Sequence, residues 1–256
     1  MKMYSEGQLE TLFDALEYFN KEDPQVVKKI INKKSNAKIN EFKKLYDQLK
    51  DMHKKENKDK YKGVKSKTKG ELLEKMIGLI TFNTKLFDLF ENVTNDTNEY
   101  DIIITPSDYL RHAYNAYSNI FFQPIVCECK NYSKKVDVTW IGKLYMLLSM
   151  SDIKIGIIFS YDTITGEGSW TAGCGLIRKI FLRDKIAIIN ICKDDYEKIY
   201  NNEKRFDEIL EEKYNDLKFI TNMEKCKRKH NSYENAQKVI DKIKNELKVL
   251  NNLKTV

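Results

Sequence analysis

Four short runs that are apolar almost throughout constrain the fold of this chain more than any other feature. They cover residues 100–105, 125–131, 153–160 and 186–192. We predict one strand for each run. Strands that are apolar along their whole length are typical of a sheet covered by helices on both faces. The pattern therefore predicts an α/β fold.

Helical spacing of apolar residues fills much of the remaining chain. Ser5 and Gln8 form a capping-box pattern before the first helix, and Asp23-Pro24 resembles the start of the next. The last pattern, Tyr233 to Leu250, has heptad spacing, and packing on the N-terminal helices is favoured over an intermolecular coiled coil. The helices are predicted at 5–53, 71–90, 138–150, 172–182 and 203–221, besides this last one.

Composition shifts divide the chain into four segments. We predict an N-terminal helical region at 1–53, a lysine-rich linker at 54–69, an α/β core at 70–200 and C-terminal helices at 201–256. The linker holds eight lysines against two acids, a net charge of +6. A solvated linker is the favoured interpretation, and a flexible arm on a DNA backbone is the alternative.

The net charge and the cysteine content indicate which partners the protein could bind and in which cell compartment it is expected. The formal charge of +7 and the pI of about 8.9 favour polyanions. The five cysteines form no CxxC pair, and the three histidines lie far in sequence from Cys127 and Cys129, which argues against a zinc site. Free buried thiols suit a reducing cytosol, and neither a leader peptide nor a membrane span is visible. We expect a cytoplasmic protein.

Two acids and a lysine form the candidate site. Side chains alternate along a strand, so Glu128 and Lys130 should share one face of the sheet, with Cys127 on the other. Asp101 begins a second apolar run. These three side chains, converging between neighbouring strands, would bind one or two divalent cations beside a phosphodiester. An accessory acid is expected from the preceding helix, with Glu74 preferred.

Mg²⁺ is the cation that fits this set, with Mn²⁺ as its expected substitute. Mg²⁺ takes oxygen ligands, few of them from protein. Asp101 and Glu128 supply two, the Cys129 carbonyl a third, and Glu74 a further one, with Glu71 as its fallback. Bound Mg²⁺ polarises a phosphoryl oxygen and lowers the pKa of a coordinated water. Lys130 would orient or deprotonate that water and offset charge on the phosphorane.

Residues 70–195 resemble the PD-(D/E)XK nuclease superfamily, in particular Mrr-like restriction endonucleases. The matching motifs are Gly70-Glu71-Leu72-Leu73-Glu74, Tyr100-Asp101-Ile102-Ile103-Ile104, Val126-Cys127-Glu128-Cys129-Lys130-Asn131 and Gly156-Ile157-Ile158-Phe159-Ser160. The resemblance implies a restriction-endonuclease-like mixed central sheet flanked by helices, with helical N- and C-terminal extensions. It makes 70–200 the nuclease core.

The resemblance also assigns roles. It implies metal ligands at Asp101 and Glu128, a catalytic lysine at Lys130 and an accessory acid at Glu74. The implied function is a Mg²⁺-dependent endonuclease acting on double-stranded DNA in restriction or phage defence, as a homodimer. The alternatives are a non-catalytic module that binds nucleic acid or a partner on the same fold, and a nuclease effector that a partner activates.

Two departures from the family pattern mark the region around Asp101. Tyr100 stands where the family often has proline, and 27 residues separate Asp101 from Glu128. Residues 105–123 must therefore form an aromatic insertion, for which local packing is favoured over a DNA wedge or a dimer contact. Three acids near Asp101 are substitutes for it: Asp96, Glu99 and Asp108. On the helix after the catalytic strand, Trp140 is expected in the core, with a substrate contact as the alternative. Lys143 could reach a phosphate, and a solvated lysine is the favoured interpretation.

Overall fold

A computed structural model provides the structure of the chain. It describes residues 5–31, 36–54, 61, 66–82, 86–94, 99–111, 113–131, 134–166 and 171–219. The chain divides into two compact units, Met1–Tyr214 and Asn215–Val256. The sheet and the helices that pack on it belong to the first unit. Most of the lysine-rich segment and the whole heptad pattern from Tyr233 to Leu250 lie outside the described residues.

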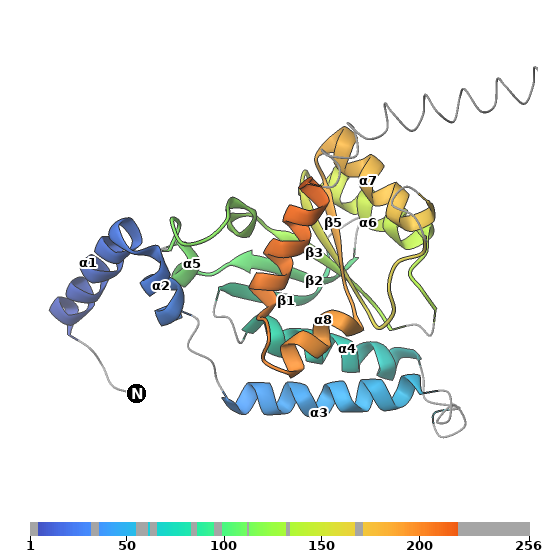
Figure 1. Ribbon diagram of the computed structural model, residues 1–256, viewed down its shortest axis with the longest axis horizontal. Helices are drawn as coiled ribbons and strands as arrows, with labels where there is room; N and C mark the ends of the chain where they lie inside the picture. Colours follow the sequence, from blue (N-terminus) through green and yellow to red (C-terminus); the bar gives the residue numbers. More distant parts are fainter. Residues whose placement is uncertain are drawn as a thin grey trace, which may run out of the picture. The chain divides into compact units, whose positions relative to one another are not determined.

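A mixed five-stranded sheet forms the centre of the first unit (Figure 1). Its strands follow one another in chain order, with β1, β2 and β3 antiparallel and β3, β4 and β5 parallel. Each parallel connection carries a helix, α6 (Val138–Met150) or α7 (Ala172–Asp184), as parallel crossovers require. The strands are β1 (Phe87–Thr94), β2 (Glu99–Pro106), β3 (Ile125–Lys130), β4 (Ile155–Ser160) and β5 (Ala187–Ile191).

Helices cover both faces of this sheet, so the predicted α/β class is confirmed. One face packs on α4 (Ser66–Phe82), whose Leu73 and Met76 are fully buried in the same cluster as Ile157 of β4. The other face packs on α6, where a Cβ added to Gly156 would lie 2.6 Å from Leu148 Cδ1. Because α6 sits this close to β4, the side chains of α6 reach the sheet surface.

The N-terminal helices begin where the sequence predicts. Ser5 caps α1 (Glu6–Glu22) through the expected capping box with Gln8, and Pro24 is the first residue of α2 (Pro24–Ile31). The third helix, α3 (Asn36–His53), packs on α4, and Figure 1 shows the two side by side. The apolar residues of α3 that join the core cluster are Phe42, Tyr46 and Leu49.

One predicted helix extends too far along the chain, and one short helix was not predicted. The helix predicted over 71–90 ends at Phe82, and Phe87–Thr94 forms β1 instead. β1 lies at one edge of the sheet and five of its eight residues are exposed, so its sequence lacks the apolar run of the other strands. The helix predicted over roughly 203–221 is confirmed over 206–219, and the short α8 (Lys193–Tyr200) before it was not predicted.

The insertion between β2 and β3 contains α5 (Asp108–Arg111) and the 3-10 helix η2 (Asn119–Phe122). Tyr117 and Phe121 are buried and their rings make an edge contact, in agreement with the local packing favoured for this insertion. Tyr109 and Tyr114, by contrast, are exposed. The insertion is thus an extension of the core that leaves two tyrosines in solvent.

β1 has a break in its pairing. Glu91 pairs with Ile102 and Val93 pairs with Tyr100, and Asn92 between them has a φ of +50°. This left-handed conformation is one that asparagine tolerates better than most residues. The break lies directly across from Asp101. No described helix is long and apolar enough to cross a lipid bilayer.

Candidate active site

The sheet opens between β2 and β3. The ladder joining these strands runs from Ile104–Ile125 to Ile102–Cys127 and goes no further. Beyond it β2 stays paired with β1, and β3 stays paired with β4 as far as Lys130. We call this opening, with Asp101, Glu128 and Lys130 in it, the fork. Figure 1 shows β2 and β3 as neighbours near the centre of the sheet.

A side chain takes over backbone pairing inside the fork. The Cys129 amide donates a hydrogen bond to Asp101 Oδ2 at 2.7 Å. A buried amide without a partner is costly, so this bond holds the two strand ends in register where the ladder has stopped. It also fixes the Asp101 carboxylate beside β3.

The three predicted charges meet at the fork. Lys130 Nζ lies 2.6 Å from Glu128 Oε1 and 3.7 Å from Asp101 Oδ2. The other face of β3 is apolar, because Cys127 and Cys129 join the core cluster, and burial raises the pKa of both thiols. The alternation expected from the sequence therefore places the acids and the lysine on one side of the strand.

Glu128 is the most deeply buried of these groups. Its side chain is 1% exposed, against 12% for Lys130 and 28% for Asp101. An ionised carboxylate loses several kcal/mol of hydration on burial, and nearby cations offset that cost. Lys143 of α6 supplies a second cation, with its Nζ 3.1 Å from Glu128 Oε1. Helix packing thus places a fourth charge at the fork.

Trp140 lies over the lysines and not in the core, so that expectation is wrong. Lys130 Nζ is 4.2 Å from the centre of the indole ring, and Lys143 Nζ is 5.4 Å from it. Asp137 caps α6 by accepting the Thr139 amide, which fixes the turn that carries Trp140. The indole face attracts the Lys130 ammonium group and restricts its position.

Glu74 faces the same charges from α4. Burial raises the pKa of this carboxyl, the carboxylates of Asp101, Glu91 and Glu71 raise it further, and Lys130 lowers it. Glu74 is half-buried, while its fallback Glu71 is exposed. A further cation nearby would favour the ionised form of Glu74.

The three substitutes for Asp101 are less well placed. Asp108 is exposed and pairs with Arg111 at 3.9 Å, and Glu99 is exposed at the start of β2. Asp96 lies outside the described residues. Among the described acids of this stretch, Asp101 is the one that the structure pairs with Lys130.

A second polar group, which sequence reasoning missed, lies beside the fork. His53 Nε2 is 2.7 Å from Asn131 Oδ1, and its ring stacks on Tyr161 at 3.8 Å and 7°. Asn131 and Tyr161 directly follow β3 and β4, so the group lies at the carboxyl ends of two parallel strands, where ligands bind in α/β sheets. Nothing local in the sequence joins residues this far apart.

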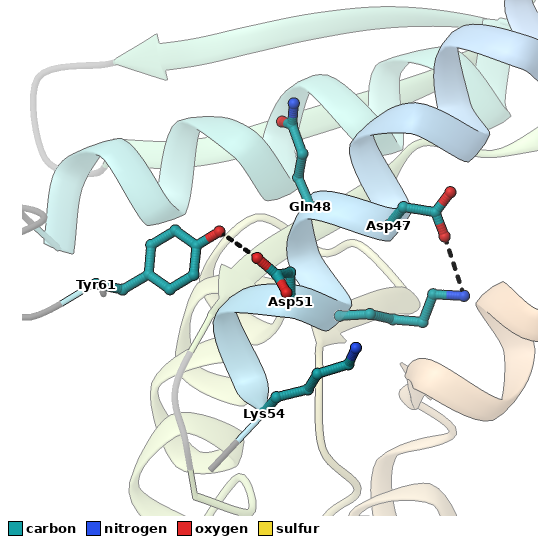
Figure 2. A pocket seen from close by; sticks show the side chains of 6 residues that line it. Asp47, Gln48, Asp51, Lys54 and Tyr61 are labelled. Atoms are coloured by element: carbon teal, nitrogen blue, oxygen red, sulfur yellow. Dashed lines mark hydrogen bonds and ion pairs between the residues drawn. The ribbon is translucent and has the colours of Figure 1, made fainter. Parts of the chain in front are cut away.

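A shallow pocket on α3 was also not predicted (Figure 2). It has a volume of about 570 Å³, and Tyr61 donates to Asp51 Oδ2 across it at 2.6 Å. Lys50 pairs with Asp47 at 3.2 Å and with Glu197 at 3.5 Å. Its acids are thus matched by donors within the pocket, and it offers no group of converging like charges.

The donors at the fork fit a hard cation such as Mg²⁺. Among the described residues, no group of three or more histidines, cysteines or acids is arranged to hold a metal. Mg²⁺ needs fewer, because it keeps several waters and binds through one or two carboxylates. Asp101 and Glu128 provide these two.

The chain was compared with known proteins at three levels. No family model, no curated protein and no solved structure matches it.

Proposed function

We propose that this protein is a Mg²⁺-dependent endonuclease that hydrolyses phosphodiester bonds of double-stranded DNA. The observation that supports it most is the fork, where buried Glu128 and partly buried Asp101 share Lys130. Ion pairs buried in this way contribute little net stability, because desolvation opposes the Coulomb attraction. A chemical role explains their presence better than a structural one.

Each residue of the fork has a part in this reaction. Asp101 and Glu128 would hold the cation, with the Cys129 carbonyl and Glu74 as further oxygen donors. When bound, the cation polarises the phosphoryl oxygen and acidifies a water. Lys130 would orient the attacking water and offset negative charge that develops on the phosphorane. The water oxygen would bond to phosphorus while the P–O bond to the leaving oxygen breaks, and the proton that the water loses balances the one that the leaving oxygen gains.

The order of elements supports the proposed membership of the PD-(D/E)XK superfamily. An amphipathic helix, α4, comes before three antiparallel strands, and the third of them carries Glu-x-Lys. A helix and a parallel strand, α6 and β4, then follow. A restriction-endonuclease-like fold with this order would place its acids at the point where β2 and β3 separate.

The partner and the biological setting extend the same proposal. The net charge of +7 favours a polyanion. Cleavage of both strands of a duplex needs two active sites, so the protein would act as a homodimer. Restriction or defence against phage is the setting that this activity suits.

Plasmid nicking tests the proposal. Supercoiled plasmid is incubated with Mg²⁺ or EDTA and with wild type, Lys130→Ala or Glu128→Gln. We expect wild type to nick the plasmid with Mg²⁺ and not with EDTA. Either variant should lose at least about 100-fold in nicking rate. Lys154→Ala is the matched control. Lys154 Nζ lies 2.6 Å from Asp152 Oδ1 in an exposed ion pair, and neither residue belongs to the fork. Equal rates for wild type and Lys130→Ala would refute the proposal.

One observation favours a second candidate, a non-catalytic module that binds nucleic acid. The two acids of the fork already face two lysines, Lys130 and Lys143, so their charges balance without a metal. This candidate predicts salt-sensitive DNA binding with no nicking under any condition. An effector activated by a partner would instead nick only after the product of a neighbouring gene is added.

A further inference from the structure

Two ammonium groups converge on one carboxylate oxygen at the fork. Lys130 Nζ lies 2.6 Å and Lys143 Nζ 3.1 Å from Glu128 Oε1. Asp101 Oδ2 lies 3.7 Å from Lys130 Nζ. Both ammonium groups thus occupy Glu128 Oε1, and a cation bound to that oxygen would have to displace one of them.

The two lysines differ in how firmly they are held. Lys130 is 12% exposed, contacts both acids and lies against the Trp140 ring at 4.2 Å. Lys143 is 50% exposed and lies farther from the ring, at 5.4 Å. A lysine on the surface can swing its ammonium into water at small cost, because that group is strongly hydrated and its stem is flexible. Lys143 is therefore the movable one of the pair.

We infer that Lys143 takes the place of the metal at Glu128 and is displaced when a divalent cation binds. This rests on the proposed function, because it assumes a cation held by Asp101 and Glu128. Without the cation, Lys143 helps to offset the burial of Glu128 and keeps the fork formed. With it, the added charge repels Lys143 toward solvent. Lys143 is thus a positioning residue that competes with the metal.

This competition has a consequence for regulation. The ion pair between Lys143 and Glu128 stabilises the metal-free protein and is broken when the cation binds. Lys143 therefore lowers the apparent metal affinity. The concentration of Mg²⁺ at which the nuclease becomes active would then depend on Lys143. A residue outside the ligand set would control the metal requirement of the enzyme.

Binding of Mn²⁺ to the full-length protein without DNA tests the inference. Free Mn²⁺ is measured by electron paramagnetic resonance at low salt, since screening weakens the repulsion. We expect Lys143→Ala and Lys143→Gln to bind Mn²⁺ about fivefold to tenfold more tightly than wild type. Lys154→Ala should match wild type, since Lys154 is 47% exposed and pairs with an acid outside the fork.

The outcomes separate this inference from the proposed function. If wild type binds Mn²⁺ and the Lys143 variants bind it equally or more weakly, the competition is refuted while the metal site stands. A lysine that only braced Glu128 would give that result, because its loss would loosen a ligand. If neither wild type nor the variants bind Mn²⁺, both proposals fall. Binding by Lys143→Ala alone would support the inference strongly.

Thermal unfolding gives a second measurement that does not depend on activity. In EDTA, Lys143→Ala should melt below wild type, because Glu128 has lost one of its two cations. Saturating Mn²⁺ should raise its Tm by more than it raises that of wild type, since tighter ligands stabilise more at equal concentration. Lys143→Gln keeps a hydrogen-bond donor near Glu128 and serves if the alanine variant folds poorly. An equal rise in wild type and both variants would contradict the inference.

Discussion

At the scale of single residues, the burial of the Glu128 carboxylate is the feature that most needs a physical explanation. Its carboxylate is 1% exposed and is matched by Lys130 and Lys143. Apolar residues of similar size would fill the same space without a desolvation cost. A chain selected for stability alone would be expected to carry them.

This argument predicts the stabilities of a single and a double variant. Glu128→Met leaves Lys130, which is 12% exposed, without its nearest acid, and we expect it to lower the free energy of unfolding by about 3 kcal/mol. Glu128→Met with Lys130→Met removes both charges and should recover most of that loss. Urea denaturation of the three proteins in EDTA measures this. A double variant less stable than the single one would mean that the pair contributes to stability.

The sequence predicted part of the site and missed the rest for a physical reason. Glu128 and Lys130 are two residues apart on one strand, so their proximity follows from local geometry. Asp101 joins them through a neighbouring strand. Lys143 reaches the fork, and His53 lies beside it, only because α6 and α3 dock where they do, and nothing near them in the sequence records that docking.

At the scale of elements, α6, which carries Lys143 and Trp140, packs on α7. A Cβ added to Gly173 of α7 would lie 2.5 Å from Ile164 Cγ2 and 2.8 Å from Ile141 Cδ1 of α6. Gly142 of α6 has nothing within 4 Å of the same position. The two glycines are thus a matched pair, both helical, one tightly packed and one open.

We predict opposite effects of alanine at these two positions. Gly142→Ala should raise the free energy of unfolding by about 0.5–1 kcal/mol, because alanine is the better helix former. Gly173→Ala should lower it by about 1–3 kcal/mol through overpacking. Thermal or urea denaturation distinguishes them. Stabilisation by both would show that α7 can move away from α6 freely.

Tyr46 links α3 to α8. Its hydroxyl donates to the Lys193 carbonyl and to Glu197, each at 3.1 Å, and the side chain is 1% exposed. Burial, followed by the charge of Glu197, raises the pKa of this phenol far above its usual value of 10.0. The native protein therefore keeps Tyr46 neutral at pH values where an unfolded chain ionises it.

The resulting pH dependence can be tested with Tyr46→Phe. Below about pH 10 the variant should be less stable than wild type by about 1 kcal/mol, the value of the lost hydrogen bonds. Above about pH 10 ionisation favours unfolded wild type alone, so the difference should shrink as pH rises. Urea denaturation at pH 8 and pH 10.5 measures both values. A constant difference would indicate that Tyr46 is not protected from ionisation.

Secondary structure followed from the sequence where burial made the pattern strong. Val138–Met150 is the predicted helix to the residue, and β3 differs from its prediction by one residue. β1 was missed because Leu86, Leu89 and Phe90 are spaced as on a helix. Pairing with β2, which no local pattern encodes, makes this segment a strand.

At the scale of the whole molecule, α3 belongs to the core of the first unit. Phe42, Tyr46 and Leu49 are at most 1% exposed and lie in one cluster with Leu73 of α4. In α1, by contrast, Leu12 and Tyr18 are 53% and 62% exposed. The two ends of the N-terminal region therefore contribute very differently to folding.

Two truncations test this difference. Deletion of residues 1–53 should abolish cooperative unfolding, because it uncovers the apolar face of α4. Deletion of 1–22 should leave a cooperative transition close to that of the full chain. Circular dichroism during thermal unfolding measures both. A cooperative transition after the longer deletion would mean that 54–256 contains a complete core.

The left-handed residue Asn92 has a consequence for behaviour at high concentration. A strand at the end of a sheet offers its free backbone groups to other copies of the chain, which is a common route to fibres. Asn92 interrupts the regular spacing of these groups two residues before the end of β1, and the exposed acids Asp88 and Glu91 repel an identical strand. The edge strand β1 thereby opposes pairing with other copies of the chain, which would otherwise lead to aggregation.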